Sequence, residues 1–269
     1  FLRKIIILLV KFHINDSNSR GNMLTNRQKN LDWIDYDRLL EITKKNFSRS
    51  LNRSRETLTD AKTEPTLNIL RGYLLNMSKE EIGTIEKSVA LTKTFQNAIG
   101  DFHQEVLGSA KGWRSTGTSG GVLDIMSDNP IKQAGNKKIL AEVKMRYNTI
   151  KASDEKNTWD KLDQAARLHG LKDHVSYIIQ IVPKKRVAYD QPWKVTGRDL
   201  REHVRCIDGT TAYYYVTGQE NALKDLLLLL PDLLSEAFPG ENKIEDSNNF
   251  VSNYFDLALP PRPYKINLP

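Results

Sequence analysis

The sequence predicts a mixed α/β fold in which a central mixed sheet is flanked by helices and preceded by a helical region. Apolar residues at helical spacing dominate the chain before Gly108. Short runs rich in leucine and β-branched residues then follow between Gly120 and Val182, and a helical pattern separates the last two of them. Strand, helix and strand in this order indicate a parallel crossover, so we expect the centre of the sheet here.

The composition allows a sizeable core but does not by itself identify a partner. The chain has 269 residues with 39% hydrophobic content, enough for one domain of about 250 residues or two smaller ones. Its formal charge is +7, but residues 1–30 hold six basic and one acidic side chain, which leaves 34 basic against 32 acidic residues in the rest. Net charge is therefore a weak argument that the protein binds nucleic acid, and the argument has to rest on local clusters of basic residues.

The single cysteine, Cys206, excludes an internal disulfide framework and suits a reducing compartment, so we expect a cytoplasmic protein. The Cys/His clusters of a zinc site are absent from the sequence. The apolar run within residues 1–14 is far shorter than the roughly 20 residues that span a bilayer, and no signal cleavage site follows it. We therefore expect no membrane association.

Residues 1–22 are expected to be a non-native or disordered extension, because the chain begins with Phe1 and Met23 opens a polar stretch before the first helix. Residues 23–269 are expected to form a single domain. Within it, 31–108 would be the helical part, 109–217 the catalytic sheet core, and 218–269 the C-terminal helices and tail.

The N-terminal part predicts three helices. The apolar spacing from Leu31 to Phe47 indicates an amphipathic helix that the Ser/Asn/Arg-rich run 48–55 should break, and 66–77 is helical in pattern. Ser78 and Glu81 form a capping box, which should open a helix that is broken or bent near Gly83 and ends at Gly108.

The C-terminal half predicts further strands and helices. Residues 157–169 have a helical pattern, 175–182 read as a strand, and 210–217, with three tyrosines, are a further strand candidate. Helices are expected at 221–229, with a short continuation past Pro231 to Phe238, and near 249–257.

Two strand runs carry charged side chains where buried strands usually carry apolar ones. The run 120–126 contains Asp124, and the run 138–144 contains Glu142 and Lys144. Because strand side chains alternate, Glu142 and Lys144 share one face and can converge with Asp124. Burying a carboxylate on a strand costs several kcal/mol of folding free energy unless a cation or hydrogen-bond donor pairs with it. This cost favours a cation-binding site.

A simpler interpretation stays open for these three residues. Asp124 would be a strand-end residue, and Glu142 and Lys144 would form an exposed ion pair on an edge strand, worth less than about 1 kcal/mol. Glu105, on the helix before the strands, also has two interpretations. It lies on a solvated face, or it is an additional metal-binding or water-orienting carboxylate supported by His103 or Gln104.

Asp124 followed by Glu142-Val143-Lys144 resembles the PD-(D/E)XK nuclease core. The segments 96–108 and 141–151, with the glycine-rich approach to Asp124 between them, are similar to type II restriction endonucleases that cut GGNCC or GGWCC sites. The similarity covers most of residues 30–240. The proline that names the core is replaced by Leu123.

This resemblance implies a homodimeric, Mg²⁺-dependent enzyme that cuts both strands of double-stranded DNA at a short palindromic site, with a cognate DNA methyltransferase protecting the host. Asp124, Glu142 and Lys144 match the catalytic pattern, whereas Glu105 matches only by its helix position. Asp124, Glu142 and the carbonyl of Val143 would hold the metal. Lys144 would lie beside the attacking water or scissile phosphate, and whether it is the base stays open.

DNA contacts are expected from basic and amide side chains that follow the strands. Some of the arginine and lysine side chains would donate hydrogen bonds to O6 and N7 of guanine, and the rest would contact only phosphates. The basic segment 194–205 has a plain solvated face as its alternative interpretation. The candidates are Arg146, Asn148, Lys184, Arg186, Arg198, Arg201 and Arg205.

Two other functions remain open from the sequence. One is a repair or recombination nuclease of the same fold that prefers DNA structure over sequence. The other is a non-catalytic DNA-binding module in which the carboxylates are only structural.

Overall fold

The computed structural model describes residues 31–55, 64–116, 123–240 and 246–265. The expected extension 1–22 and part of the glycine-rich segment, 117–122, lie outside these ranges. Residues 31–269 cluster as one compact unit. Among the described residues, no helix is both long and apolar enough to cross a membrane.

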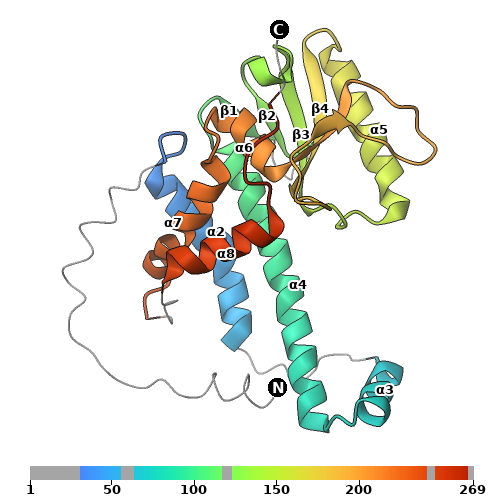
Figure 1. The fold of residues 1–269 in the computed structure, drawn as a ribbon, viewed down its shortest axis with the longest axis vertical. Helices are drawn as coiled ribbons and strands as arrows, with labels where there is room; N and C mark the ends of the chain where they lie inside the picture. Colours follow the sequence, from blue (N-terminus) through green and yellow to red (C-terminus); the bar gives the residue numbers. More distant parts are fainter. Residues whose placement is uncertain (1–30, 56–63, 117–122, 241–245, 266–269) are drawn as a thin grey trace, which may run out of the picture. The chain divides into compact units, whose positions relative to one another are not determined.

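The sheet has six strands in the order β1-β2-β3-β4-β6-β5 (Figure 1). Its centre is the parallel set β3 (Lys138–Arg146), β4 (His174–Val182) and β6 (Val204–Asp208). The short strands β1 (Trp113–Ser115), β2 (Ile125–Ser127) and β5 (Asp190–Pro192) add to it in antiparallel fashion. Helix α5 (Ala152–His169) connects β3 to β4, so the predicted parallel crossover is confirmed.

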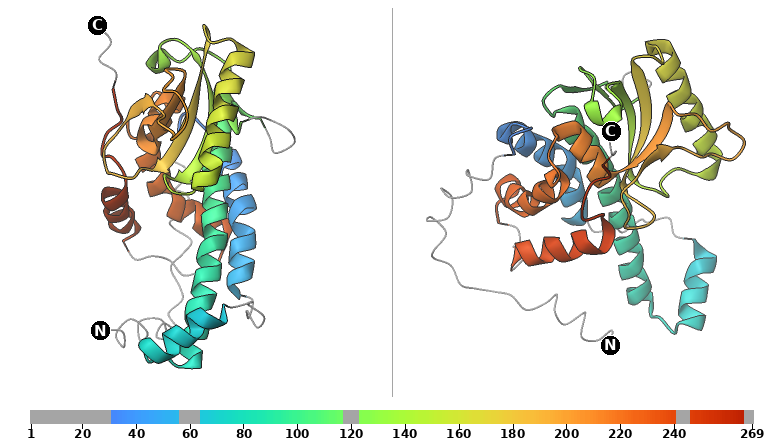
Figure 2. Two further views of the ribbon diagram at one scale, coloured as in Figure 1. Left: turned by 90° about the vertical axis from the view of Figure 1, so that its right-hand side faces the viewer. Right: turned by 45° about the horizontal axis from the view of Figure 1, so that its top comes forward.

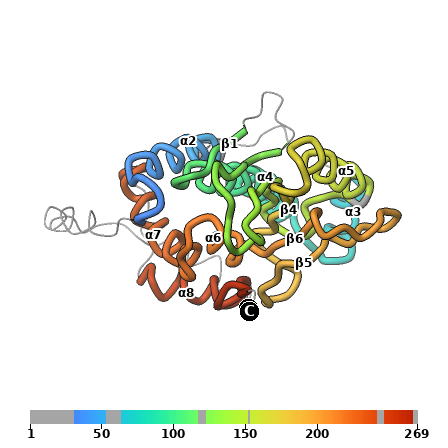
Figure 3. Tube along the Cα trace, turned by 90° about the horizontal axis from the view of Figure 1, so that it is seen from above, coloured from blue at the N-terminus to red at the C-terminus, as the bar shows by residue number. Residues whose placement is uncertain are grey.

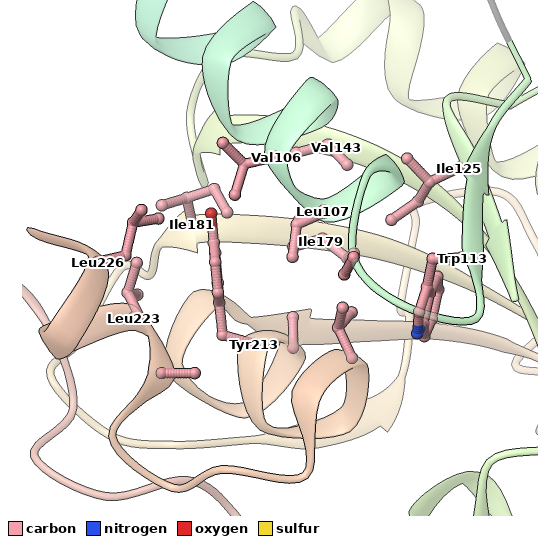
Figure 4. Close-up of a cluster of buried hydrophobic side chains, with 14 of the residues drawn as sticks. Val106, Leu107, Trp113, Ile125, Val143, Ile179, Ile181, Tyr213, Leu223 and Leu226 are labelled. Carbon is pink, nitrogen blue, oxygen red and sulfur yellow. The ribbon is translucent and has the colours of Figure 1, made fainter. Parts of the chain in front are cut away.

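Alternating side chains of β3 divide the core between the two faces of the sheet. Ile139, Ala141 and Val143 pack in the larger cluster with helices α4 (Lys79–Gly108), α6 (Gly209–Thr217) and α7 (Ala222–Ala237). Figure 4 shows Val143 among side chains of this cluster. Leu140 packs on the other face with Trp159 and other residues of α5. In Figure 3, α5 and the α6–α7 pair accordingly lie on opposite sides of the strands. Glu142 and Lys144 belong to the α5 face by the same alternation.

The first N-terminal helix continues further along the chain than the sequence predicts. Helix α2 spans Tyr36–Arg55, so the predicted break at 48–55 is wrong. Within it, Ser48 donates to the carbonyl of Lys44 and Asn46 to that of Ile42, which satisfies these polar side chains inside the helix. Helix α2 packs along α4, and such packing outweighs weak local propensity (Figure 2).

Helices α3 (Pro65–Leu74) and α4 (Lys79–Gly108) follow. The predicted capping box is confirmed: Ser78 accepts from the Glu81 backbone N–H, and the Glu81 carboxylate accepts from that of Ser78. No break interrupts α4 at Gly83. The helix ends at Gly108, as predicted, where a Cβ would lie 3.0 Å from the backbone N of Ser115. The glycine therefore permits the close approach of β1 to the end of α4.

The predicted strand at 210–217 is wrong, because these residues form helix α6 (Gly209–Thr217). The strand lies just before it as β6, within the region that the sequence presents as a basic segment. The Asp208 carboxylate accepts from the backbone N–H and the hydroxyl of Thr211, at 3.1 and 2.5 Å, and so begins the helix. Burial of Tyr213 and Tyr215 then stabilises a helix despite the β-propensity of this run.

The C-terminal helices largely follow the prediction. Helix α7 (Ala222–Ala237) continues through Pro231, and α8 spans Ser247–Ala258. Leu223, Leu226 and Leu233 of α7 are buried in the larger core cluster. The leucine-rich sequence of α7 therefore packs into the protein core.

A stability prediction follows from the junction between β6 and α6. A Cβ on Gly209 would overlap the carbonyl oxygen of Ile181 and lie 2.8 Å from its Cα. We expect Gly209→Ala to lower the free energy of unfolding by about 3 kcal/mol, measured by urea denaturation. Gly100→Ala is the control, because nothing lies within 4 Å of its Cβ and alanine should stabilise α4 by about 0.5–1 kcal/mol. Equal stability of the two variants would contradict this prediction.

Candidate active site

The register of β2 on β3 brings the three predicted catalytic residues to one face. Ile125 pairs with Ala141, and the backbone N–H of Asp124 donates to the carbonyl of Ala141 at 3.0 Å. Continuing this antiparallel register places Asp124 directly across from Glu142. The ammonium of Lys144 lies 2.7 Å from the Glu142 carboxylate.

The Asp124 side chain is fixed by the backbone of β3. Its Oδ2 accepts a hydrogen bond from the backbone N–H of Val143 at 2.8 Å. The N–H and C=O of one strand residue point to the same side of the strand, so the Val143 carbonyl also faces the Asp124 side. The two carboxylates thus share one face of the sheet, and the Val143 carbonyl points in the plane of the sheet toward the strand segment that carries Asp124.

The site is partly buried and carries more negative than positive charge. The side chains of Glu142 and Lys144 are 19% and 29% exposed. Burial, and next the charge of Glu142, raise the pKa of Asp124 to about 6, while the Val143 N–H and Lys144 oppose this shift. Strand β3 is paired with β4 through this stretch and with β2 as far as Ala141, and the Glu142–Lys144 ion pair is half-buried rather than exposed.

These groups suit a hard divalent cation with few protein ligands. Mg²⁺ keeps several waters and needs only one or two carboxylates besides substrate oxygens. Within the described ranges, no cluster of three or more His, Cys, Asp or Glu side chains forms a metal cage. The donors here are thus of the kind that Mg²⁺ accepts, and they lack the nitrogen and sulfur ligands of a zinc site.

Helix α4 supplies two further carboxylates, in a pocket whose lining does not include Asp124, Glu142 or Lys144. Glu105 forms an ion pair with Lys45 of α2 at 2.8 Å and lines a pocket of about 510 Å³ between α2 and α4. Gln104 lines the same pocket, whereas His103 is buried and bonds the hydroxyl of Tyr213 at 2.8 Å. Of the two residues expected to support Glu105, only Gln104 lies with it.

Asp101 is a carboxylate that the sequence interpretation missed. It lies one helical turn before Glu105 on α4, in the same pocket, and its charge contributes to the raised pKa of Asp124. Its own pKa is raised by burial and by Glu105. The i, i+4 spacing of Asp101 and Glu105 was the signal that could have identified it.

Gln180 on β4 was also missed. It pairs in register with Lys144, so both side chains point to the same face. The hydroxyl of Tyr189 donates to the Gln180 carbonyl oxygen at 2.6 Å, which leaves the amide nitrogen free to donate on this face. Only the pairing of β3 with β4 reveals this neighbour, because 36 residues separate it from Lys144 in the sequence.

Four of the seven predicted DNA-contacting residues are engaged within the chain. Arg205 bonds the buried carboxylate of Asp190 at 2.6 Å, which also accepts from the hydroxyls of Tyr177 and Tyr215. This cluster closes the far edge of the sheet. Three other arginines pair with acidic side chains of the helices: Arg186 with Asp256, Arg198 with Asp160, and Arg201 with Asp163.

The other three candidates are exposed near the carboxyl ends of β3 and β4. Arg146 is the last residue of β3 and pairs in register with Val182, the last residue of β4. Asn148 and Lys184 follow these two strands. Within the described ranges, the side chains of Arg146, Asn148 and Lys184 form no hydrogen bond or ion pair. They are thus available to an external ligand beside the Lys144 end of β3.

Comparison with known proteins agrees on one kind of enzyme. The family model for the Eco47II restriction endonuclease matches residues 31–239, from α2 to α7 and across all the described strands. The type II restriction enzyme Eco47II of Escherichia coli is 32% identical over 194 residues, which cover 67% of this chain and 77% of that protein. The type II restriction enzyme Sau96I of Staphylococcus aureus is 24% identical over 172 residues, 60% of this chain and 61% of that protein.

A pH dependence of stability follows from the raised pKa of Asp124. Because the folded protein favours the protonated carboxyl, the stability that Asp124 contributes is present at pH 4 and is lost as pH rises through about 6. We expect Asp124→Asn, which keeps an acceptor for the Val143 N–H, to be more stable than the wild type at pH 8 and about equally stable at pH 4. Urea denaturation without divalent ions measures this difference.

The matched variant is Glu142→Gln. Since the charge of Glu142 raises the pKa of Asp124, this variant should bring that pKa closer to its ordinary value in an NMR titration. An Asp124→Asn variant that is less stable than the wild type at both pH values would contradict the prediction.

Proposed function

Since the chain belongs to the Eco47II restriction endonuclease family, we propose that this type II site-specific deoxyribonuclease hydrolyses both strands of double-stranded DNA with Mg²⁺ at a PD-(D/E)XK centre. The observation that carries the proposal is the convergence of Asp124, Glu142 and Lys144 on one face of the β2–β3 pair. Family membership favours this function over a structure-selective repair nuclease and over a non-catalytic module.

The proposed metal ligands are Asp124, Glu142 and the carbonyl of Val143. The raised pKa of Asp124 supports them, because two carboxylates with a single ammonium leave negative charge that a cation would offset. When bound, Mg²⁺ would supply a Lewis acid for the phosphoryl oxygens and a water of lowered pKa.

The protein's own groups have separate roles in this proposal. Val143 holds the Asp124 carboxylate in place through its backbone N–H, which fixes the distance between the two strands. Glu142 holds the Lys144 ammonium, which can donate to a phosphate oxygen or to the attacking water. Gln180 offers its amide N–H on the same face, oriented by Tyr189.

The proposed substrate is a short palindromic site of the GGNCC kind, and the support for it is the sequence similarity of segment 141–151. Arg146, Asn148 and Lys184 are the proposed first contacts to DNA because their side chains are exposed and not paired within the described ranges. Arg198 and Arg201 would have to leave Asp160 and Asp163 to bind a base or phosphate. Two copies of the chain, one for each strand, and a cognate methyltransferase complete the proposed system.

The catalytic assignment predicts a separation of cleavage from binding. We expect Glu142→Ala and Lys144→Ala to abolish cleavage of DNA with Mg²⁺, because each removes a group that contacts metal or phosphate. Binding of a DNA fragment that carries the target site, measured with Ca²⁺ by fluorescence anisotropy, should stay within about tenfold of the wild type.

Glu220→Ala is the matched control for these variants. Glu220 forms an ion pair with Lys265 on the exposed surface, so its loss should leave cleavage unchanged. Digestion of DNA of known sequence, followed by mapping of the ends, gives the site and cut position. Full cleavage by either active-site variant would sink the assignment.

The two kinds of basic residue predict two kinds of defect. Arg146→Ala and Lys184→Ala should each weaken DNA binding and, by removing one phosphate-binding cation, make the slope of log affinity against log salt shallower by about one. Arg205→Ala should instead lower the free energy of unfolding by about 3 kcal/mol, because it leaves the buried carboxylate of Asp190 without its cation. Anisotropy across a salt series and urea denaturation distinguish them, and a stable Arg205→Ala that fails only in DNA binding would reverse this division.

A further inference from the structure

Among the described residues, the largest group of exposed apolar side chains lies on α3 and its C-terminal cap. Leu67, Leu70 and Leu74 follow one another at i, i+3 and i+7, and Ile69 and Tyr73 lie beside them at i and i+4. Their exposures run from 45% for Leu67 to 88% for Tyr73, and Leu75 adds 67%. Helix α3 has no buried residue. We call these six side chains the α3 face.

The α3 face belongs to an arm formed by α3 and the N-terminal half of α4. Glu86 of α4 bonds Asn68 at 2.8 Å and lies 3.7 Å from the guanidinium of Arg71, which fixes α3 against α4. Val89, three residues beyond Glu86 on the same side of α4, is a further apolar side chain of this arm and is 59% exposed. Figures 1 and 2 both show α3 at the end of α4 that is distant from the sheet.

The chemistry of this face is unsuited to DNA and suited to another copy of the same surface. Arg71 is the one charged residue in Pro65–Leu74, and Glu86 of the same arm neutralises it. A phosphate backbone would therefore meet no available cation on α3. Because the face carries no net charge, two copies can meet without repulsion even though the chain as a whole is basic.

We propose that the α3 face is the surface through which two copies of this chain dimerise. The proposal rests on the proposed function, because each chain contains one Asp124–Glu142–Lys144 centre and a double-strand cut needs two. Six exposed side chains of this size offer on the order of 600 Å², most of the roughly 800 Å² that each partner contributes to a standard interface. The α3 face is therefore close in size to one side of a specific dimer interface, and polar side chains at its rim would supply the rest.

The length of α4 limits how the two arms pack. From Asp101, beside the active site, to Lys79 at the tip there are 22 residues, or about 33 Å of helix. Two arms joined end to end would hold the two centres more than about 60 Å apart, whereas DNA grooves are only about 6–12 Å wide. The two-fold axis therefore runs along the arms, so that α3 packs beside α3 of the partner and both sheets lie at the same end.

The test measures mass first, without DNA or Mg²⁺. We expect sedimentation equilibrium to give twice the chain mass for the wild type, and half of that for Leu70→Asp/Leu74→Asp, with a dissociation constant at least tenfold higher. Both side chains are exposed in one copy, so the far-UV circular dichroism spectrum should be unchanged, although loss of the dimer can lower the melting temperature. Leu168→Asp on α5, 72% exposed, is the matched control and should stay dimeric.

Leu257→Asp tests the rival surface on α8, where Leu257 is 78% exposed. A monomeric wild type, a dimeric Leu70→Asp/Leu74→Asp, or dissociation by Leu257→Asp alone would each overturn the proposal. None of these experiments measures cleavage, so none of their outcomes contradicts the catalytic assignment. Conversely, a catalytic variant that is dimeric but does not cleave DNA would not contradict the proposed interface.

Cysteine cross-linking tests the direction of the arms. If α3 packs beside α3 of the partner, a Leu74→Cys variant treated with an added oxidant such as diamide should form a disulfide between position 74 of one chain and position 74 of the other. A Leu168→Cys variant should form no such disulfide. The native Cys206 is 6% exposed and should not react in either variant. A dimer that requires α3 but gives no Leu74→Cys cross-link would contradict the parallel arrangement.

Discussion

The hydrogen bond from the Val143 N–H to the Asp124 carboxylate sets the geometry on which the candidate site depends. It extends the short β2–β3 ladder by one residue, with a side-chain oxygen in place of a main-chain carbonyl. Since side chains alternate along a strand, a slip of one residue would send Asp124 to the opposite face, away from Glu142 and Lys144. The register is in turn fixed by Ile125 and Ala141, both fully buried in the larger core cluster.

The same register explains the electrostatic repulsion within the site. The carboxylates of Asp124 and Glu142 lie across from each other on neighbouring strands, which is normally destabilising. The ammonium of Lys144 compensates only part of their negative charge. The raised pKa of Asp124 records this repulsion together with burial. A bound cation would relieve this repulsion. Without a cation, removing the charge of either carboxylate would relieve it as well, so a structural role alone does not explain why both carboxylates are present.

The sequence predicted those parts of the fold that local patterns encode. The Glu-x-Lys spacing and the capping box at Ser78 depend on residues a few positions apart, and the crossover from β3 to β4 follows from the order of strand, helix and strand patterns. The structure confirms the helix start and the crossover. The strand predicted at 210–217 failed because Asp208 begins a helix that the tyrosines then stabilise by burial.

Long-range partners were beyond the reach of local patterns. Arg198 and Arg201 read as free cations in the sequence, yet their carboxylate partners lie 38 residues away on α5. Gln180 and Asp101 were missed for a similar reason, since only the sheet and the approach of α4 bring them near Lys144 and Asp124. The sequence does not reveal which basic residues have a distant acidic partner, and within the described ranges Arg146, Asn148 and Lys184 have none and stay proposed DNA contacts.

Helix α4 joins the two surfaces that the proposed function requires. Near its C-terminal end it carries Asp101, whose charge acts on Asp124, and its N-terminal half holds α3 and the α3 face. One uninterrupted helix of 30 residues is stiff on this scale, so the position of the arm fixes the position of the carboxylates. In a dimer held by two such arms, each centre is placed relative to the two-fold axis by a single helix. The spacing of the two cuts would then follow from the length and crossing angle of α4 more than from any loop.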